Sequence, residues 1–344
     1  MSSPQQKDNK LTKNKVVKKK EVNKEGKKVV KKKEVKKVVK KKEDKTMSVN
    51  FSVSNLFVIM NMNYYSKFDK VLTACWRSYN LTDYKAWSEK IASEGKVNKT
   101  QSAHKQLEQI ERKCGVPIMK DVYKSQASNC VASLNKSQSD IGSKVDSIKT
   151  DVKKMTTLTK ANVSTEEIKK LVSEATNTRF GNFQEAGAIK TFEVQCDKKV
   201  SSGQCRLTYK IGEFNGADWI LVGKIDGMTA DNEVVEIKNR VKKLFKQLRD
   251  YEEPQIRTYM SLMNNAPKGF LVENLRSPSG NQINTIEVNF NDKPTYFEDN
   301  VLPAIIKFAQ FFHIFFETPQ MKADLMEGNE AVLYKQFQEF EPVI

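Results

Sequence analysis

Cysteine and histidine are scarce in this sequence of 344 residues, and neither forms a metal-binding pattern. The spacing argues against a disulfide framework and against a zinc cluster, and it favours a reducing compartment. Cys196 and Cys205 could approach each other across a hairpin, although a paired or metal-bound role is the minor alternative. His104 and His313 are isolated, which is typical of structural histidines. The cysteines are odd in number, widely scattered and without a Cys-x-x-Cys: Cys75, Cys114, Cys130, Cys196 and Cys205.

A long apolar run is also absent. The most apolar late segment, "LPAIIKFAQFFHIFF" (302–316), is interrupted by Lys307, Gln310 and His313, and it is too short and too polar to span a bilayer. It predicts core packing of a late helix, with an oligomer contact as the alternative. The polar, basic N-terminus has no apolar stretch after it, which argues against a secretory signal. We therefore expect a soluble intracellular protein without membrane association, in the cytoplasm or nucleus (of a host cell if the chain is viral).

Outside the first 46 residues, positive and negative charges nearly balance. Of the formal net charge of +17, residues 1–46 carry +13, from 19 Lys and six acidic residues, and the remainder carries only +4. The motif "VVKKKEV" occurs at 16–22 and 29–35, and "VVKKKED" follows at 38–44. Low complexity and the lack of aromatic residues predict a disordered tail. It is interpreted as a polycationic arm for nucleic acid, a nuclear-import signal or a solubilising extension.

Residues 47–163 have a predominantly helical pattern. Some of the apolar residues recur every seven positions, as in one helix of a packed hairpin or a short oligomer contact: Leu134, Ile141, Ile148 and Met155. A further helix is expected to begin at Ser164, which forms a capping box with Glu167. The apolar face of that helix consists of Ile168, Leu171, Val172 and Ala175.

The pattern changes from helix to strand after residue 190. Four segments before residue 240 alternate apolar and polar residues or carry an apolar run, as strands do: "TFEVQC" (191–196), "CRLTYKIG" (205–212), "DWILVGKID" (218–226) and "NEVVEIK" (232–238). A helix to about Met263 precedes "GFLVEN" and "NTIEVNF", which predict two more strands, and helices close the chain. We therefore expect an α/β (α+β) fold with a central mixed β-sheet flanked by helices.

The segment "VVEIKNR" (234–240) places an acid and a lysine inside an apolar strand. Side chains alternate between the faces of a strand, so Val234, Glu236 and Lys238 share one side while Val235 and Ile237 share the other. The acid and the amine therefore converge on one face, and the apolar residues anchor the opposite face.

Asp226 ends the preceding strand, and an antiparallel hairpin through "GMTADN" would bring it beside Glu236. Two carboxylates held together repel each other unless a cation lies between them. Oxygen ligands without His or Cys nearby favour Mg²⁺ or Mn²⁺ over zinc. Lys238 next to such an ion can hold a water or stabilise charge on a phosphate. This set predicts metal-assisted phosphodiester hydrolysis, and the alternative is a surface hairpin with an ordinary Glu–Lys pair.

Three further features favour the catalytic interpretation. Gln255 and Tyr259 in "PQIRTYMSLM" are four residues apart and share a helical face, with Pro254 suited to the first turn. "TRFGNFQEAG" places Glu185 in a helical context, six residues after Arg179. The third feature is the order: a helical acid, a strand Asp, a strand Glu-x-Lys and finally Gln-x-x-x-Tyr.

In this order the sequence resembles the PD-(D/E)XK nuclease superfamily, within it the RecB-like and phage-lambda-type (YqaJ-like) exonucleases, including those of phages and large DNA viruses. The resemblance covers about residues 164–275, and "RFGNFQEAG", "GKIDG", "VVEIKNR" and "PQIRTYM" carry it. It departs from the name-giving motif at Ile225, where the signature proline stands. It implies a restriction-endonuclease-like core, and the expected organisation is a tail (1–46), a helical N-terminal region (47–163) and a nuclease domain (164–344).

The resemblance also implies roles for individual residues. Asp226 and Glu236 would ligate the metal, with the backbone carbonyl of Ile237 as a further ligand. Lys238 would position the nucleophilic water. Glu185 would complete the metal site or orient its water. The catalytic set is therefore Asp226, Glu236, Lys238 and Glu185.

The resemblance further implies that Gln255 and Tyr259 support the site and touch the DNA backbone. Arg179 and Arg240, together with Lys242 and Lys243, could bind phosphates or could form a solvated charge cluster. Glu174 and Glu193 are neighbouring alternatives for the helical acid.

The leading hypothesis is a metal-dependent deoxyribonuclease, an exonuclease acting on duplex DNA ends in recombination, repair or replication. The alternatives are a structure-specific or nonspecific endonuclease and a non-catalytic DNA-binding protein on a nuclease fold. The expected partners are DNA, a single-strand annealing or replication protein, and further copies of the chain in a homo-oligomer.

Overall fold

The structure is a computed structural model that describes residues 47–62, 68–115, 164–201, 205–240, 243–277 and 280–343. Two expectations lie outside the described residues, namely the Lys-rich tail 1–46 and the heptad pattern from Leu134 to Met155. Residues Thr46–Ile344 form one compact unit, to which all the described helices and strands belong.

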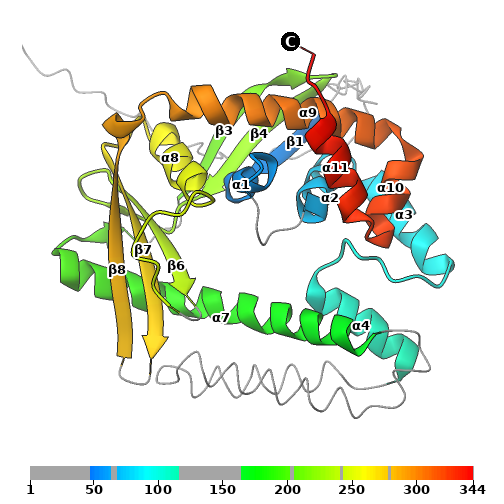
Figure 1. Ribbon diagram of the computed structural model, residues 1–344, viewed down its shortest axis with the longest axis horizontal. Helices are drawn as coiled ribbons and strands as arrows, with labels where there is room; N and C mark the ends of the chain where they lie inside the picture. Colours follow the sequence, from blue (N-terminus) through cyan, green and yellow to red (C-terminus); the bar gives the residue numbers. More distant parts are fainter. Residues whose placement is uncertain are drawn as a thin grey trace, which may run out of the picture. The chain divides into compact units, whose positions relative to one another are not determined.

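Three strands form a mixed sheet in the order β1–β4–β3 (Figure 1). β1 (Met47–Ser52) runs parallel to β4 (Ala217–Lys224), and β3 (Arg206–Phe214) runs antiparallel to β4. β1 corrects the prediction that residues 47–163 are helical. "MSVNFS" alternates polar and apolar residues, and burial of its Val49 and Phe51 on one face of the sheet requires a period of two residues.

Five strands form a second mixed sheet in the order β2–β5–β6–β7–β8. They are β2 (Val200–Ser201), β5 (Gly227–Thr229), β6 (Val234–Arg240), β7 (Lys268–Ser277) and β8 (Gly280–Asn289). β6 and β7 run parallel, and the other neighbours run antiparallel. The expected mixed α/β class is therefore confirmed, with two mixed sheets in place of a single central one.

The chain passes from the first sheet to the second between Lys224 and Gly227. The predicted hairpin paired 218–226 directly with 232–238, but β4 ends at Lys224 and belongs to the first sheet. Part of the expected turn forms β5 instead, in which Gly227 pairs with Val235 of β6. Asp226 therefore lies at the crossing point, one residue before that pair.

α7 (Thr165–Cys196) is a helix of 32 residues whose C-terminal part packs on the second sheet (Figure 1). It begins where the capping box predicted, because the Ser164 side chain accepts a hydrogen bond from the backbone N–H of Glu167. The strand predicted at 191–196 is wrong, since these residues form the last turns of α7. Phe192 is fully buried whereas Val194 is 84% exposed, and a strand would place both on one face.

The described helices between β1 and α7 are short: η1 (Val53–Asn55), α1 (Leu56–Ile59), α2 (Phe68–Tyr79), α3 (Leu81–Ser93) and α4 (Ala103–Cys114). α2 packs on β1, and α4 packs on α7. Two of the helices begin at polar caps. Asn80 accepts a hydrogen bond from the N–H of Asp83 in α3, and Ser102 accepts one from the N–H of Lys105 in α4.

α8 (Glu253–Leu262) follows β6 and packs on β6 and β7. The chain then ends in five elements after β8: η4 (Phe290–Asp292), the π-helix η5 (Phe297–Val301), α9 (Leu302–Glu317), α10 (Pro319–Glu327) and α11 (Glu330–Glu339). Phe308 of α9 lies 5.4 Å from Phe51 and 6.0 Å from Trp219 between ring centroids. The Phe-rich late helix therefore packs in the core, as predicted.

Among the described residues, no single helix is long and apolar enough to cross a membrane. One bent pair, Phe297–Glu317 with Pro319–Glu327 at an angle of 98°, passes the same criterion by length and composition alone.

One large hydrophobic cluster combines residues from both sides of the boundary predicted at 163/164, for example Trp76 with Trp219 and Phe312. That boundary therefore does not separate two cores. A smaller cluster lies between α7 and the second sheet: Ala188, Ile189, Phe192, Val200, Val235, Ile237, Phe270 and Val272.

Candidate active site

β6 separates the two hydrophobic clusters, and its alternation orients its charged residues. Val235 and Ile237 belong to the cluster against α7, whereas Val234 belongs to the large cluster on the other side. Glu236 and Lys238 share the side of Val234, and Lys238 Nζ lies 2.9 Å from Glu236 Oε1. The prediction that the acid and the amine meet on one face is confirmed.

α8 supplies the side chain that joins the acid to the lysine. Pro254 stands in its first turn, where a missing N–H costs nothing. Gln255 Nε2 donates to Glu236 Oε1 at 2.8 Å, and Lys238 Nζ donates to Gln255 Oε1 at 2.7 Å. Together with the Glu236–Lys238 contact, these bonds close a ring of three side chains.

Tyr259, one turn further along α8, supports this ring from inside the protein. Its hydroxyl donates to the backbone carbonyl of Lys224 at 3.2 Å and accepts from Gln255 Nε2 at 3.4 Å. Only glycine fits at 223, because an added Cβ would lie 2.5 Å from Tyr259 Cε1. Gln255 and Tyr259 are both buried. Their contact with DNA remains a prediction.

Asp226 reaches the ring from the crossing between the two sheets. Its Oδ2 accepts a hydrogen bond from the backbone N–H of Ile237 at 2.8 Å. Burial raises the pKa of Asp226 to about 7, and the charge of Glu236 adds to this effect, while the bond from Ile237 opposes it. Near neutral pH, the metal-free protein therefore holds this carboxyl only partly ionised.

Glu236 is 4% exposed, and its two oxygens differ. Oε1 accepts from Lys238 and from Gln255, whereas Oε2 is buried and has no hydrogen-bond partner among the described residues. Burial raises the pKa of Glu236, and the charge of Lys238 opposes the rise. Burial alone would lower the pKa of Lys238, but the charge of Glu236 raises it above its usual value. Lys238 is therefore a cation.

The two carboxylates fit a divalent metal ion. Asp226 and Glu236 offer the hard oxygen atoms that Mg²⁺ and Mn²⁺ prefer, and a buried oxygen without a partner is one that a cation would satisfy. In the described part of the chain, no group of three or more His, Cys, Asp and Glu side chains could hold a metal. This donor set suits Mg²⁺, which keeps several waters. The carbonyl of Ile237 stays a predicted ligand.

Glu185 of α7 acts on the site through its charge, which raises the pKa of both Asp226 and Glu236. The two alternative acids of the same helix have partners elsewhere. Glu174 forms an ion pair with a lysine of α2, and Glu193 accepts a hydrogen bond from the backbone at the start of β2 at 2.9 Å. Of these three acids, Glu185 is the one whose charge acts on both carboxylates, and its role in the site stays a prediction.

Arg240 lies between two buried carboxylates that the sequence analysis missed. Its Nη1 and Nη2 donate to Glu252 at 2.7 and 3.0 Å, and its Nε donates to Glu273 at 2.8 Å. Glu273 interrupts the apolar segment "GFLVEN" as Glu236 interrupts "VVEIK", so the same anomaly could have revealed it. The phosphate contact of Arg240 remains a prediction. Lys242 and the side chain of Arg179 lie outside the described residues.

Among the described cysteines and histidines, none belongs to a cluster that could hold a metal. Cys75, Cys196 and Cys205 are free, whereas Cys130 and the side chain of Cys114 lie outside the described residues. His313 shares a hydrogen bond of 3.0 Å with the backbone carbonyl of Phe214, and His104 lies 3.7 Å from Glu108.

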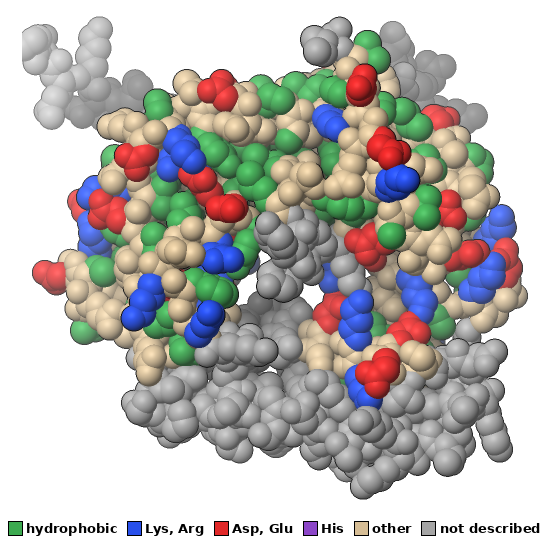
Figure 2. All heavy atoms as spheres, in the orientation of Figure 1, with side chains coloured by type: hydrophobic (Ala, Val, Ile, Leu, Met, Phe, Trp, Pro, Cys, Tyr) green, Lys and Arg blue, Asp and Glu red, His purple; other side chains and the backbone are tan. Residues whose placement is uncertain are grey.

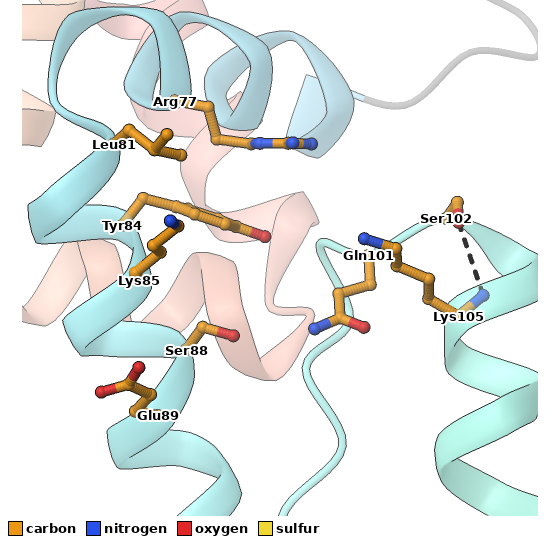
Figure 3. A pocket seen from close by; sticks show the side chains of 9 residues that line it. All are labelled: Arg77, Leu81, Tyr84, Lys85, Ser88, Glu89, Gln101, Ser102 and Lys105. Atoms are coloured by element: carbon orange, nitrogen blue, oxygen red, sulfur yellow. Dashed lines mark hydrogen bonds between the residues drawn. The ribbon is translucent and has the colours of Figure 1, made fainter.

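A cavity of about 480 Å³ between α3 and the start of α4 shares no residue with this site (Figure 3). The Arg77 guanidinium carbon lies 5.5 Å from the centroid of the Tyr84 ring. Three basic side chains line the cavity: Arg77, Lys85 and Lys105. The cavity is therefore separate from the candidate site, where β6, α8 and the crossing residue Asp226 meet.

No family model matches the chain, and no curated protein matches it. An alkaline exonuclease from Laribacter hongkongensis is similar in structure, with 14% identity and a TM-score of 0.30 over 40% of this chain and 71% of that chain. The same exonuclease in complex with dAMP has 13% identity and a TM-score of 0.30 over 48% of this chain and 87% of that chain. Similarity at this level carries no argument about activity, which rests on the site.

Proposed function

We propose that the chain is a deoxyribonuclease that hydrolyses DNA phosphodiester bonds with Mg²⁺ or Mn²⁺ as its cofactor. The observation that supports this proposal is the ring of Glu236, Lys238 and Gln255 beside Asp226, in which Glu236 Oε2 is buried and has no partner among the described residues. Most buried carboxylate oxygens in folded proteins have a hydrogen-bond partner. A metal site instead leaves one oxygen for the cation.

A divalent ion bound by Asp226 and Glu236 would supply charge neutralisation at the phosphate and a more acidic water. Lys238 has three N–H donors, and Glu236 and Gln255 accept from it. The remaining donor belongs to a side chain that is 23% exposed, so it can reach a water or a phosphate oxygen. Because the ring fixes the ammonium, its orientation need not be set during the reaction.

In the hydrolysis, the water oxygen forms a bond to phosphorus while the bond from phosphorus to the leaving sugar oxygen breaks. The water proton leaves to solvent or to the departing oxygen. Lys238 would hold the attacking water or stabilise the charge that develops on the phosphate. Glu185 would help to orient that water from the neighbouring helix.

The finer proposal is an exonuclease that acts on duplex DNA ends in recombination, repair or replication. Its support is the order of the four sequence elements and their resemblance to viral and phage exonucleases. A homo-oligomer and a single-strand annealing or replication partner belong to the same proposal.

The test compares linear duplex, covalently closed circular and single-stranded DNA, each with Mg²⁺ or with EDTA. We expect degradation of the linear duplex in Mg²⁺ alone, and an intact circle. If the closed circular DNA is also cleaved, the enzyme is an endonuclease and not an exonuclease. Lys238→Ala should lower the rate by about 100-fold or more, which is typical for the loss of one stabilising donor. The matched control is Lys210→Ala, an exposed lysine of β3.

Two results would contradict the proposal. One is the absence of cleavage by the unmutated protein with either metal, which would favour a non-catalytic DNA-binding protein. The other is unchanged cleavage by the Lys238→Ala variant.

A further inference from the structure

The segment between β6 and α8 carries a cluster of cations beside the candidate active site. We name residues 243–249 the basic loop. Its three cations are Lys243 and Lys246, which are exposed, and Arg249, which is half-buried. Among the described residues, none of the three forms a salt bridge. Asp250, the next residue, leaves a net charge of +2 over 243–250.

A buried carboxylate fixes the backbone of the basic loop. Glu273, which is fully buried, accepts hydrogen bonds from the backbone N–H of Phe245 at 3.0 Å and from that of Lys246 at 2.7 Å. Lys246 has a φ of 60°, a left-handed conformation that few residues other than glycine adopt. Leu248 packs against the large hydrophobic cluster. The loop is therefore held in one conformation, although its lysine side chains face solvent.

The Phe245 ring gathers positive charge. The guanidinium carbons of Arg240 and Arg249 lie 4.7 and 5.0 Å from its centroid, and Lys243 Nζ lies 5.8 Å away. Cation–π contacts offset part of the repulsion between these groups. Phe245 thus holds several cations close together, and a polyanion that binds there would make several favourable electrostatic contacts at once.

The basic loop starts and ends at the two elements that hold the catalytic ring. Arg240 stands two residues after Lys238 on the same face of β6, and it binds Glu252, the N-cap residue of α8. Gln255 follows three residues later. Figure 2 shows Lys and Arg side chains over the region in which Figure 1 draws the ends of β6 and β7.

We propose that the basic loop binds the phosphodiester backbone of DNA next to the bond that is cut, with Lys243, Lys246 and Arg249 as its phosphate contacts. The substrate belongs to the proposed function, on which this inference rests. Duplex DNA carries about one negative charge per 1.7 Å of helix axis, so three cations on one loop can contact successive phosphates. A loop that is already fixed loses little conformational entropy on binding. Arg240 also helps to hold the loop in place, through its bonds to Glu252 and Glu273.

The experiment measures the binding of the full chain to a duplex oligonucleotide in EDTA over a range of salt concentrations. The test variant combines Lys243→Gln, Lys246→Gln and Arg249→Gln. The control variant removes the same charge from the cavity of Figure 3, by Arg77→Gln, Lys85→Gln and Lys105→Gln. Each phosphate contact contributes about 0.9 to the slope of log K against log salt, so the test variant should lose about three from that slope.

An unchanged slope in the test variant, or an equal loss in the control variant, would overturn the proposal. Since Arg249 is half-buried, thermal unfolding of both variants is recorded. If the triple variant unfolds, the exposed pair Lys243→Gln and Lys246→Gln replaces it, with an expected loss of about two. Binding in EDTA does not depend on cleavage. If the slope falls in the test variant but the unmutated protein does not cleave DNA, the proposed nuclease activity is contradicted and the DNA-binding role of the basic loop is not. If the unmutated protein cleaves DNA but the slope is unchanged in the test variant, only the role of the basic loop is contradicted.

Discussion

Replacing Asp226 with Asn should stabilise the metal-free protein and abolish its activity. The pKa of this carboxyl is raised from 3.8 to about 7, by burial first and by the charge of Glu236 second. Between these two values, the folded protein binds a proton that the unfolded chain has released. The free energy of unfolding of the metal-free protein therefore falls as the pH rises from about 4 to about 7, and the loss stays constant above that range.

The size of this effect follows from the pKa. One pKa unit corresponds to 1.36 kcal/mol, so about three units give at most roughly 4 kcal/mol at pH 8. Asp226 is only partly buried, and a range of about 2–4 kcal/mol allows for screening by solvent. In a folded unit of this size, that range corresponds to a shift in Tm of roughly 4–12 °C. The free energy of unfolding of the Asn variant should not fall over this pH range, because its amide does not titrate.

The assay is urea or thermal unfolding of both proteins in EDTA at pH 5 and at pH 8. The gain of the variant should be complete at pH 8 and about one third as large at pH 5. Mg²⁺ should then stabilise the unmutated protein more than the variant, which has lost a ligand. Asp231→Asn is the control, since this acid lies in the turn between β5 and β6 and its side chain is 72% exposed. Parallel pH curves for the Asp226→Asn and unmutated proteins would refute the reasoning.

Four further changes test other parts of the structure. Arg240→Gln should lower the free energy of unfolding in urea by about 3–5 kcal/mol, because two buried carboxylates lose their cation, whereas Lys268→Gln in an exposed pair should cost at most about 1 kcal/mol. Gly223→Ala should lower both Tm and kcat, because its methyl group would lie 2.5 Å from a tyrosine ring carbon. Gln255→Leu should lower kcat at saturating DNA by about 10-fold or more, since the lysine and the glutamate each lose a bond. Deleting 1–46 should flatten the salt dependence of DNA binding in the same duplex titration, while the remaining cleavage still requires the metal.

The local part of the site was predictable because a strand has a period of two residues. That period placed Glu236 and Lys238 on one face, and the four-residue spacing of Gln255 and Tyr259 placed both on one side of α8. The position of Asp226 beside Glu236 was also predictable, but the path of the chain between these two residues was not. The strand that precedes Asp226, β4, belongs to the other sheet. The short strand β5 then pairs with β6.

The two wrong predictions of secondary structure share a physical origin. Each concerns a segment of six residues, which is too short for its apolar pattern to distinguish a helix from a strand. "TFEVQC" alternates like a strand, yet it continues a helix whose Phe192 packs on the sheet. "MSVNFS" is equally short and became a strand, because β4 offers it a partner 170 positions later, from Met47 to Ala217. Partners this distant leave no local signal. Arg240 has nearer partners, since Glu252 and Glu273 lie 12 and 33 positions later, at the N-cap of α8 and in β7.

The pairing of β1 with β4 has a consequence for how the protein is made. β1 leaves the ribosome 170 residues before β4, which is its only strand partner in the described residues. Contacts this far apart in sequence are slow to form, because a long loop must close first. Val49 and Phe51 therefore lack their strand partner until β4 has been made, and they are candidates for chaperone binding. β4 leads into Asp226, so we expect the two sheets and the candidate metal ligands Asp226 and Glu236 to assemble only after β1 has docked on β4.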